Sequence, residues 1–360
     1  RARGCFEVER ICQSRMKIPV FHDDQHGTAI VVCAAAKNAL LVTERKFENI
    51  KIVSTGGGAA GIACLNMLVK LGVKKKNIWL CDKHGLVYAG RSIDMNSEKS
   101  AFAQKTELRS LEEVIENADM FLGLSGPNVL KPASIKKMKS KPIIFALANP
   151  SPEVMPESAR KAAPDAIIAT GRSDFFNQVN NVLCFPFIFR GALDVEATEI
   201  NDEMQVACIN AIAKIAQTTT SAEAAAAYQG ESLTFGPEYL IPKPFDPRLS
   251  VVIPAAVAKA AMDSGVAKKP ISDLESYKDK LKEGVFKSAL LMRPVFETAK
   301  KVKRRIVFAE GEDERVLRAA QAILEETSEQ PILIGRPSVL EQRCERLGLV
   351  IRPDIDFEIV

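Results

Sequence analysis

The sequence lacks the features that mark several specialised classes of protein. No apolar run approaches the roughly 18 uninterrupted residues of a membrane-spanning helix, so we expect no membrane segment. The eight cysteines include no C-x-x-C pair, and no signal or transit peptide is recognisable. A reducing compartment is therefore favoured over a disulfide framework, and we expect a cytoplasmic protein.

The sequence also lacks a large excess of positive or negative charge. The 49 Lys and Arg residues nearly balance the 45 Asp and Glu residues, which leaves a net charge of +4 and a pI of about 8.5. That excess is too small to predict a nucleic-acid partner. With 360 residues, of which 47% are hydrophobic, the chain is long enough for a substantial core, and its length predicts two domains. It opens on Arg1 and enters a helical stretch at once, so we interpret it as a fragment.

The most informative stretch is Ile50–Asp82, which combines a glycine-rich motif with a strand on either side. The β-branched run Ile50–Thr55 predicts a buried strand, and Ile62–Leu71 carries apolar residues at helical spacing. Between them lies Gly56-Gly57-Gly58-Ala59-Ala60-Gly61. A second buried strand is predicted at 77–81 and ends at Asp82, 21 residues after Gly61. This context is typical of a dinucleotide-binding βαβ unit.

Each position in this motif has a physical role. Gly56 permits a tight turn, Gly58 lets the backbone approach a pyrophosphate, and Gly61 lets helix and strand pack closely. The phosphates are expected on the free N–H groups of the helix N-terminus. Asp82 is expected to accept hydrogen bonds from a ribose. The alternative is a glycine-rich turn that binds no ligand.

Strands and helices continue to alternate after this motif. This order predicts an α/β fold with a doubly wound, parallel, Rossmann-like sheet, followed by the beginning of a second α/β domain. Ligands of such sheets bind beyond the carboxyl ends of the strands, so we expect Ser125-Gly126, Asn149 and the loop after Ala169 on the glycine-rich rim. Each of them also suits an ordinary turn. Further strands are predicted at 119–124, 143–147 and 165–169.

The turn His22–Thr28 contains two adjacent acids, Asp23 and Asp24, ahead of a long apolar helix. Asp is a good helix cap, and paired carboxylates are also hard ligands for Mg²⁺ or Mn²⁺. The spacing alone favours capping. Further along, the amides of 177–181 precede an apolar run; they either bond to backbone groups or hold the carboxylates of a small substrate.

Several stretches together carry a resemblance to a known family. They are FHDDQHGTA (21–29), GGGAAG (56–61), ALANP (146–150), TGRSD (170–174), NQVNNVLCFPFIFRGALD (177–194) and FGPEYLIPKPFDPRL (235–249). The chain resembles a malic enzyme of the bacterial hybrid type, in which a malic domain precedes a phosphate acetyltransferase-like domain. The implied domains are the tail of a substrate domain at 1–22, an NAD(P)-binding domain at 23–267, a helical linker at 268–303 and the start of the transferase-like domain at 304–360.

The resemblance implies oxidative decarboxylation of L-malate to pyruvate and CO₂, with reduction of NADP or NAD and a requirement for Mg²⁺ or Mn²⁺. It implies that Asp24 is a metal ligand supported by Asp23, which reverses the capping interpretation. Gly57, Gly58, Ala59 and Ala60 are then expected to contact phosphates, Asn149 to lie at the nicotinamide and the malate, and Asn181 to bind a substrate carboxylate. A homo-oligomer, and acetyl-CoA as an effector of the C-terminal domain, are further implications.

The sequence also departs from the family pattern. The family's lysine base, its tyrosine acid and a Glu-Asp metal pair are expected upstream of Arg1, so we expect the chain as given to bind dinucleotide weakly and not to oxidise malate. Phe176 stands where a proline is expected. Asp82 favours NAD over NADP by repelling a 2′-phosphate, whereas Lys83 and 74–76 favour NADP, which the resemblance supports. A non-catalytic module that senses dinucleotide or acetyl-CoA, and a metal-free dehydrogenase, are the alternative functions.

Overall fold

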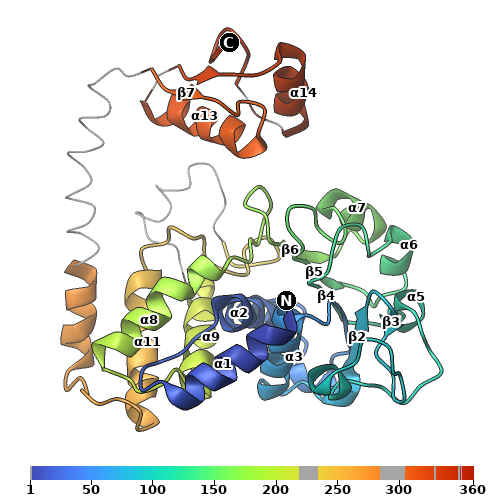
Figure 1. The fold of residues 1–360 in the computed structure, drawn as a ribbon, viewed down its shortest axis with the longest axis vertical. Coiled ribbons are helices and arrows are strands. Elements are labelled where there is room, and N and C mark those ends of the chain that lie inside the picture. Colours follow the sequence, from blue (N-terminus) through green and yellow to red (C-terminus); the bar gives the residue numbers. More distant parts are fainter. Residues whose placement is uncertain (1, 219–233, 284–304, 328–329, 348, 350) are drawn as a thin grey trace. The chain divides into compact units, whose positions relative to one another are not determined.

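The computed structural model describes residues 2–218, 234–283, 305–327, 330–347, 349 and 351–360, drawn as solid ribbon in Figure 1. The chain divides into two compact units, Arg1–Lys282 and Glu283–Val360, and each is described by itself. In the described residues no helix is both long and apolar enough to cross a membrane.

The first unit contains a six-stranded sheet with the order β3-β2-β1-β4-β5-β6. All neighbouring strands are parallel except for the short edge strand β3, which is antiparallel to β2. The predicted doubly wound parallel sheet is therefore confirmed. The strands are β1 (Ile52–Thr55), β2 (Ile78–Asp82), β3 (Gly85–Leu86), β4 (Met120–Gly123), β5 (Ile143–Ala146) and β6 (Ile167–Thr170).

The strand register brings the carboxyl ends of β1, β4, β5 and β6 to one level. Thr55 lies opposite Gly123, Gly123 opposite Ala146, and Ala146 opposite Thr170. Every residue of β1, β4, β5 and β6 is buried, because helices cover both faces of a parallel sheet. The loops that leave these ends therefore share one rim (Figure 1).

The two faces of the sheet carry different layers. Long helices, among them the largely apolar and mostly buried α2, pack on the face that presents Ile52 and Leu122. Shorter helices pack on the face that presents Val53 and Phe121. The helices are α1 (Ala2–Arg15), α2 (Thr28–Val42), α3 (Ala59–Lys70), α4 (Ser97–Ser100), α5 (Leu111–Val114), α6 (Pro132–Ile135), α7 (Pro156–Ala162), α8 (Phe185–Asp194), α9 (Asp202–Gln217) and α11 (Leu249–Asp263), with short turns η1 (Asp23–Gly27), η2 (Phe47–Asn49), η3 (Lys75–Asn77) and η4 (Asn181–Leu183).

Two sequence interpretations of this unit need correction. The polar, glycine-bearing sequence of Gly85–Arg91 favours a loop, but its first two residues form β3, which pairs with β2 through Cys81 and Leu86. The helical linker was expected from residue 268, but residues up to Lys282 belong to the first unit. Tyr277 and Leu281 pack into its core, and the Tyr277 hydroxyl donates a 2.6 Å hydrogen bond to Asp194. A helix expected near Ala222–Tyr228 lies outside the described residues.

The second unit contains a three-stranded parallel sheet with the order β7-β8-β9. A segment of this length is expected to be too short to close a core of its own. The structure nevertheless has a small one, in which Leu317, Leu340 and Phe357 are almost completely buried. Its elements are β7 (Val307–Phe308), α13 (Glu314–Thr327), β8 (Ile332–Leu333), α14 (Pro337–Leu347) and β9 (Glu358–Ile359).

Candidate functional site

A cavity of about 660 Å³ lies at the rim formed by the carboxyl ends of the strands. It brings together residues that are far apart in the sequence and that were predicted as site residues. Its lining includes Asp23, Asp24, Ala60, Asn149 and Asn181. The acidic turn, Ala60 of the glycine-rich motif and the loop after β5 therefore meet at one cavity.

Two glycines of the glycine-rich motif have no room for a side chain, and a third borders open space. Gly56 has φ +105°, and a Cβ there would meet the carbonyl oxygen of Leu124 at 2.2 Å. A Cβ on Gly61 would meet the carbonyl oxygen of Gly56 at 2.0 Å. Gly58 faces open space, with no atom within 4 Å of such a Cβ. Gly56 and Gly61 are thus packed against backbone carbonyl groups, whereas the space next to Gly58 is open.

The open side leads to the N-terminus of α3. No side chain caps this helix, whose N-cap residue is Gly58. The first N–H groups of an uncapped helix carry partial positive charge and suit phosphate oxygens. Ala60, in the first turn of α3, lines the cavity. The other residues of the motif are not among the lining residues: Ala59 and Gly61 flank Ala60 in the helix, and Gly56, Gly57 and Gly58 precede it.

Asp82, at the tip of β2, differs from the exposed ribose acceptor that the sequence suggests. Its side chain is only 7% exposed, and its Oδ2 accepts hydrogen bonds from Arg91 at 2.5 Å and from Lys99 at 2.8 Å. Its Oδ1 accepts from the backbone N–H of His84. Burial raises the pKa of Asp82, but the hydrogen bonds from Arg91 and Lys99 outweigh it and lower the pKa overall.

Lys99 was not identified from the sequence, although it lies directly against the glycine-rich turn. A Cβ on Gly57 would meet Cε of Lys99 at 2.6 Å. The ammonium group also pairs with Asp94 at 3.1 Å. Arg91 and Lys99 occur in a loop and a short helix without periodicity, so nothing in the sequence indicated that they face Asp82.

The acidic turn η1 is organised around Asn181 rather than around helix capping. The side-chain amide of Asn181 donates to Oδ2 of Asp23 at 3.2 Å and accepts from the hydroxyl of Thr28 at 3.0 Å. No side-chain cap is formed at the start of η1 or of α2. The capping interpretation of Asp23 and Asp24 is therefore wrong.

The two carboxylates of η1 have little compensation from the protein. Asp24 is exposed, and in the described part of the chain neither acid forms an ion pair. Oδ1 of Asp23 is buried and has no hydrogen-bond partner. Burial is the main cause that raises the pKa of Asp23; the hydrogen bond from Asn181 opposes it, and the negative charge of Asp24 adds to it.

These residues fit part of a site for a hard divalent cation. Carboxylate oxygens suit Mg²⁺ or Mn²⁺, and Mg²⁺ commonly uses one or two protein carboxylates together with water and substrate oxygens. Among the described residues there is no group of three or more His, Cys, Asp or Glu side chains that could hold a metal. Asp24 is thus the exposed carboxylate that the described chain presents to the cavity, and Asp23, whose buried Oδ1 has no partner, also lines it.

Glu153 is a further residue of this rim that sequence analysis missed. Its side chain is completely buried and accepts hydrogen bonds from the backbone N–H groups of Ser125 at 2.8 Å and Ala148 at 3.1 Å. It thereby joins the loops that follow β4 and β5. A Cβ on Gly123 would lie 2.4 Å from its carboxyl carbon, so a glycine that ends an apolar strand was the available signal.

Two further amides of 177–181 bond to the backbone. Asn177 is 4% exposed, has φ +55° and donates to the carbonyl groups of Ile168 and Pro237. Asn180 accepts from the N–H of Val182 and caps η4. Of the two alternatives left open by the sequence, backbone bonding therefore describes Asn177 and Asn180. Phe176, found where a proline was expected, is 48% exposed.

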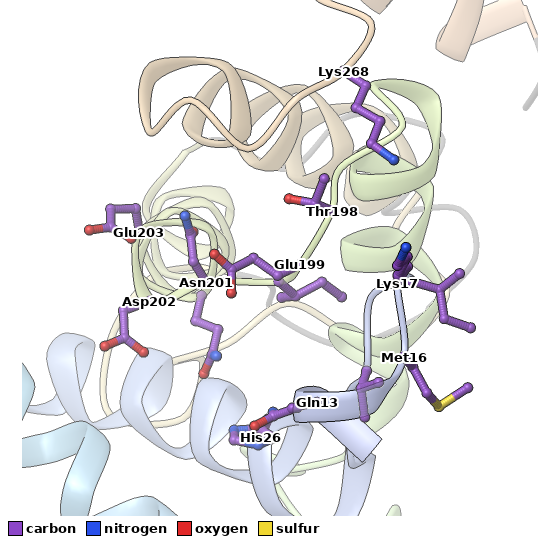
Figure 2. A pocket seen from close by; sticks show the side chains of 14 residues that line it. Gln13, Met16, Lys17, His26, Thr198, Glu199, Asn201, Asp202, Glu203 and Lys268 are labelled. Carbon is purple, nitrogen blue, oxygen red and sulfur yellow. The ribbon is translucent and has the colours of Figure 1, made fainter. Parts of the chain in front are cut away.

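A larger cavity of about 850 Å³ lies elsewhere in the first unit (Figure 2). It is bordered by the end of α1 and the start of α9, and its wall includes Gln13, Lys17, His26 and Asp202. None of the predicted site residues lines it. Size alone therefore does not identify the functional cavity.

Comparison with known proteins connects this geometry to a family. Residues 25–228 match the family described as "Malic enzyme, NAD binding domain". Residues 290–360 match the family described as "Phosphate acetyl/butaryl transferase". Both halves of the predicted hybrid arrangement are thus found in the predicted order.

Individual relatives agree with these matches. The chain is 58% identical over 361 residues to the NAD-dependent malic enzyme of Rhizobium meliloti, an alignment that covers 100% of this chain and 47% of the relative. It is 55% identical to the NADP-dependent malic enzyme of Salmonella typhimurium, with coverages of 100% and 48%. The chain therefore spans about half the length of the curated relatives it matches.

A solved structure shows the same relationship in three dimensions. The malic enzyme from Pyrococcus horikoshii is 36% identical and has a TM-score of 0.69, with 81% of this chain and 65% of that chain covered. The resemblance inferred from the sequence motifs is confirmed. On its fold, its glycine-rich βαβ unit and its match over residues 25–228, the chain belongs to the malic enzyme family.

Proposed function

We propose that this chain forms the cofactor-binding part of an enzyme that oxidatively decarboxylates L-malate to pyruvate and CO₂ and reduces NADP. The observation that carries the proposal is the 660 Å³ cavity in which Asp24, Asn149 and Asn181 meet the N-terminus of α3. The names of the relatives support the same activity, because they are malic enzymes. They do not favour a non-catalytic sensing module.

The residues of the rim have distinct parts in this proposal. The N–H groups of Ala59, Ala60 and Gly61 bind the pyrophosphate, and Gly56, Gly57 and Gly58 let it approach the backbone. Asn149 contacts the nicotinamide and malate from the loop after β5, and Glu153 fixes that loop through the N–H of Ala148. When bound, the dinucleotide supplies the hydride acceptor.

The acidic turn orients the substrate through a cation. Asp24 holds Mg²⁺ or Mn²⁺ from the cavity wall, and Asp23 supports it from the adjacent position. The bound cation supplies the Lewis acid that favours loss of CO₂. Asn181 keeps Asp23 in place by its 3.2 Å hydrogen bond and offers its amide edge to a substrate carboxylate. The base and the acid of the reaction are expected upstream of Arg1.

NADP is the preferred cofactor in this proposal because the charge of Asp82 is already compensated. Arg91 and Lys99 both bond to Asp82, so its carboxylate does not repel a 2′-phosphate in the way that a free acid does. Lys99 also lies against Gly57, at the turn that receives the dinucleotide. The Lys99→Gln variant tests this preference by binding of adenosine 2′,5′-bisphosphate and of ADP to the chain. We expect the variant to bind the bisphosphate about tenfold more weakly and ADP with unchanged affinity. An equal loss of affinity for both nucleotides contradicts the preference for NADP.

Two finer features of the whole protein belong to the same proposal. Acetyl-CoA is proposed as an effector that acts through residues 304–360, which is supported by the transferase match at residues 290–360. A homo-oligomer is proposed from the family resemblance. Equilibrium dialysis with acetyl-CoA and analytical ultracentrifugation test these two features separately.

The activity itself requires a protein extended with the upstream segment that the resemblance predicts, called here the extended protein. We expect malate-dependent formation of reduced NADP that disappears with a chelator and returns with Mn²⁺. The 360-residue chain serves as the control and is expected to bind nucleotide without turnover. Activity of the extended protein that persists without any divalent metal contradicts the proposal and favours a metal-free dehydrogenase.

A further inference from the structure

The acidic turn η1 is bonded to the carboxylate of Glu9, a residue of helix α1. Oε1 of Glu9 lies 2.6 Å from Nε2 of His26, and Oε2 of Glu9 accepts a 2.9 Å hydrogen bond from the amide of Gln25. The Glu9 side chain is only 10% exposed. One buried carboxylate therefore bonds the two residues that directly follow Asp24.

These contacts are needed for reasons of burial. Gln25 is 1% exposed, and a buried amide without a partner costs roughly 1–3 kcal/mol. Glu9 accepts from this amide and removes that cost. A buried carboxylate is itself expensive unless it is bonded, and Gln25 and His26 satisfy one oxygen each. Gln13, one turn further along α1, adds a longer contact of 3.4 Å to Oε1.

A second set of hydrogen bonds, from the cavity residue Asn181, also holds η1. Asn181 donates to the carbonyl oxygen and to the carboxylate of Asp23, at 3.3 and 3.2 Å. Asp24 lies between the two anchored positions. Within the described residues its side chain has neither a hydrogen bond nor an ion pair, and it faces the 660 Å³ cavity. Its direction is consequently set by the turn and not by contacts of its own.

We infer that Glu9 is a positioning residue for Asp24: by bonding Gln25 and His26 it fixes the rotation of η1 and so aims the Asp24 carboxylate into the cavity. This inference rests on the proposed function, in which Asp24 binds the cation. It adds a contribution from α1, whose sequence shows no relation to the cofactor motif. His26 and Gln13 of this arrangement are visible at the wall of the separate, larger cavity in Figure 2.

The size of the effect follows from the behaviour of residues that orient metal ligands. Their removal commonly lowers metal affinity by about 10–100-fold, although they do not touch the metal. The glycine-rich turn does not include Glu9 or its partners, so nucleotide affinity is expected to remain. This split between metal and nucleotide separates positioning from a general loss of structure.

The test compares three variants in the extended protein. Glu9→Ala removes both contacts, whereas Glu9→Gln keeps an oxygen for Gln25 and an amide that can donate to Nε2 of His26. Glu7→Ala is the matched control, because Glu7 is an exposed acid on the same helix. Mn²⁺ affinity is measured by electron paramagnetic resonance without substrate, and NADP affinity by calorimetry. The KM for Mn²⁺ and kcat are then measured separately.

For Glu9→Ala we expect the Mn²⁺ dissociation constant and the KM for Mn²⁺ to rise about tenfold, with an unchanged dissociation constant for NADP. Glu9→Gln is expected to restore Mn²⁺ binding to within about threefold of the wild type, and Glu7→Ala to have no effect. Unchanged Mn²⁺ affinity in Glu9→Ala overturns the inference, as does an equal loss of Mn²⁺ and NADP affinity. Absence of Mn²⁺-dependent malate oxidation in the wild type instead contradicts the proposed function.

Discussion

Two groups of carboxylates near the rim of the sheet differ in whether positively charged side chains of the protein pair with them. At the tip of β2, Asp82 is bonded to Arg91 and Lys99 within a buried cluster. At η1, Asp23 and Asp24 stand next to each other without an ion pair in the described residues. The protein compensates the first group by itself, whereas in the described residues the negative charge of the second is not paired with a cationic side chain.

The pKa directions follow the same difference. Hydrogen bonds from two cations overcome burial at Asp82 and lower its pKa. Burial and the neighbouring Asp24 together raise the pKa of Asp23, since the single amide of Asn181 does not balance them. A carboxylate that is compensated contributes to folding, and one that is not is available for binding.

The largest effect is expected for Asp24→Asn in the extended protein. Loss of a charged ligand removes several kcal/mol of stabilisation, so kcat/KM for malate should fall by about 100-fold or more. Asp202→Asn, which removes an exposed acid, is the control and should change kcat/KM little. Steady-state kinetics at saturating NADP measure kcat/KM for both variants. Nearly full activity of Asp24→Asn would contradict the proposal that Asp24 binds the cation.

A smaller effect, this time on stability, is expected for Arg91→Ala. The Arg91 and Asp82 side chains are 2% and 7% exposed, and removal of one partner from a buried pair costs about 3 kcal/mol. Urea denaturation of the 360-residue chain measures the loss. The double variant Asp82→Ala/Arg91→Ala should recover part of it, because no uncompensated charge is left. Strictly additive losses would show that the two side chains do not interact.

The pH dependence of stability sharpens the comparison further. Because the pKa of Asp82 is lower in the folded state than its ordinary value near 3.9, its ionisation stabilises the fold above about pH 4. This contribution is lost as the pH falls through the folded-state pKa. The difference in unfolding free energy between the wild type and Asp82→Asn should be constant from neutral pH to about pH 5 and shrink below that. A difference that grows on acidification would reverse the assigned sign.

The smallest effect is expected for an ion pair on the surface. Lys259 and Asp263 are bonded one turn apart on α11, with side chains 56% and 63% exposed. Lys259→Ala should therefore change the unfolding free energy by only about 0.5 kcal/mol. Urea denaturation in parallel with Arg91→Ala checks this. A cost similar to that of Arg91→Ala would mean that burial does not explain the difference between the pairs.

The parts of the fold that were predictable are those encoded locally. Strands such as Ile143–Ala146 are buried on both faces and are therefore continuous apolar runs, which appear directly in the sequence. Gly56 and Gly61 were recognised because their spacing reflects two close backbone contacts. The shared rim then followed from the parallel order of the strands.

The parts that were missed depend on contacts between distant elements. Asp82 was correctly placed at the tip of its strand, but its partners come from loops whose course has no periodic signal. Glu153 is a single acid in a proline-containing segment, and only the folded chain shows that it joins two strand ends. The contact of Glu9 with Gln25 and His26 depends on how α1 packs, which residue spacing does not determine.

The most direct test of the account is the position of a cation in crystals of the extended protein grown with Mn²⁺ and NADP. Anomalous scattering at the manganese edge locates the ion without reference to activity. We predict a manganese peak about 2.1 Å from a carboxylate oxygen of Asp24, inside the cavity that Ala60 and Asn149 also line. A manganese peak at another set of ligands, with Asp24 uncoordinated, would contradict the account.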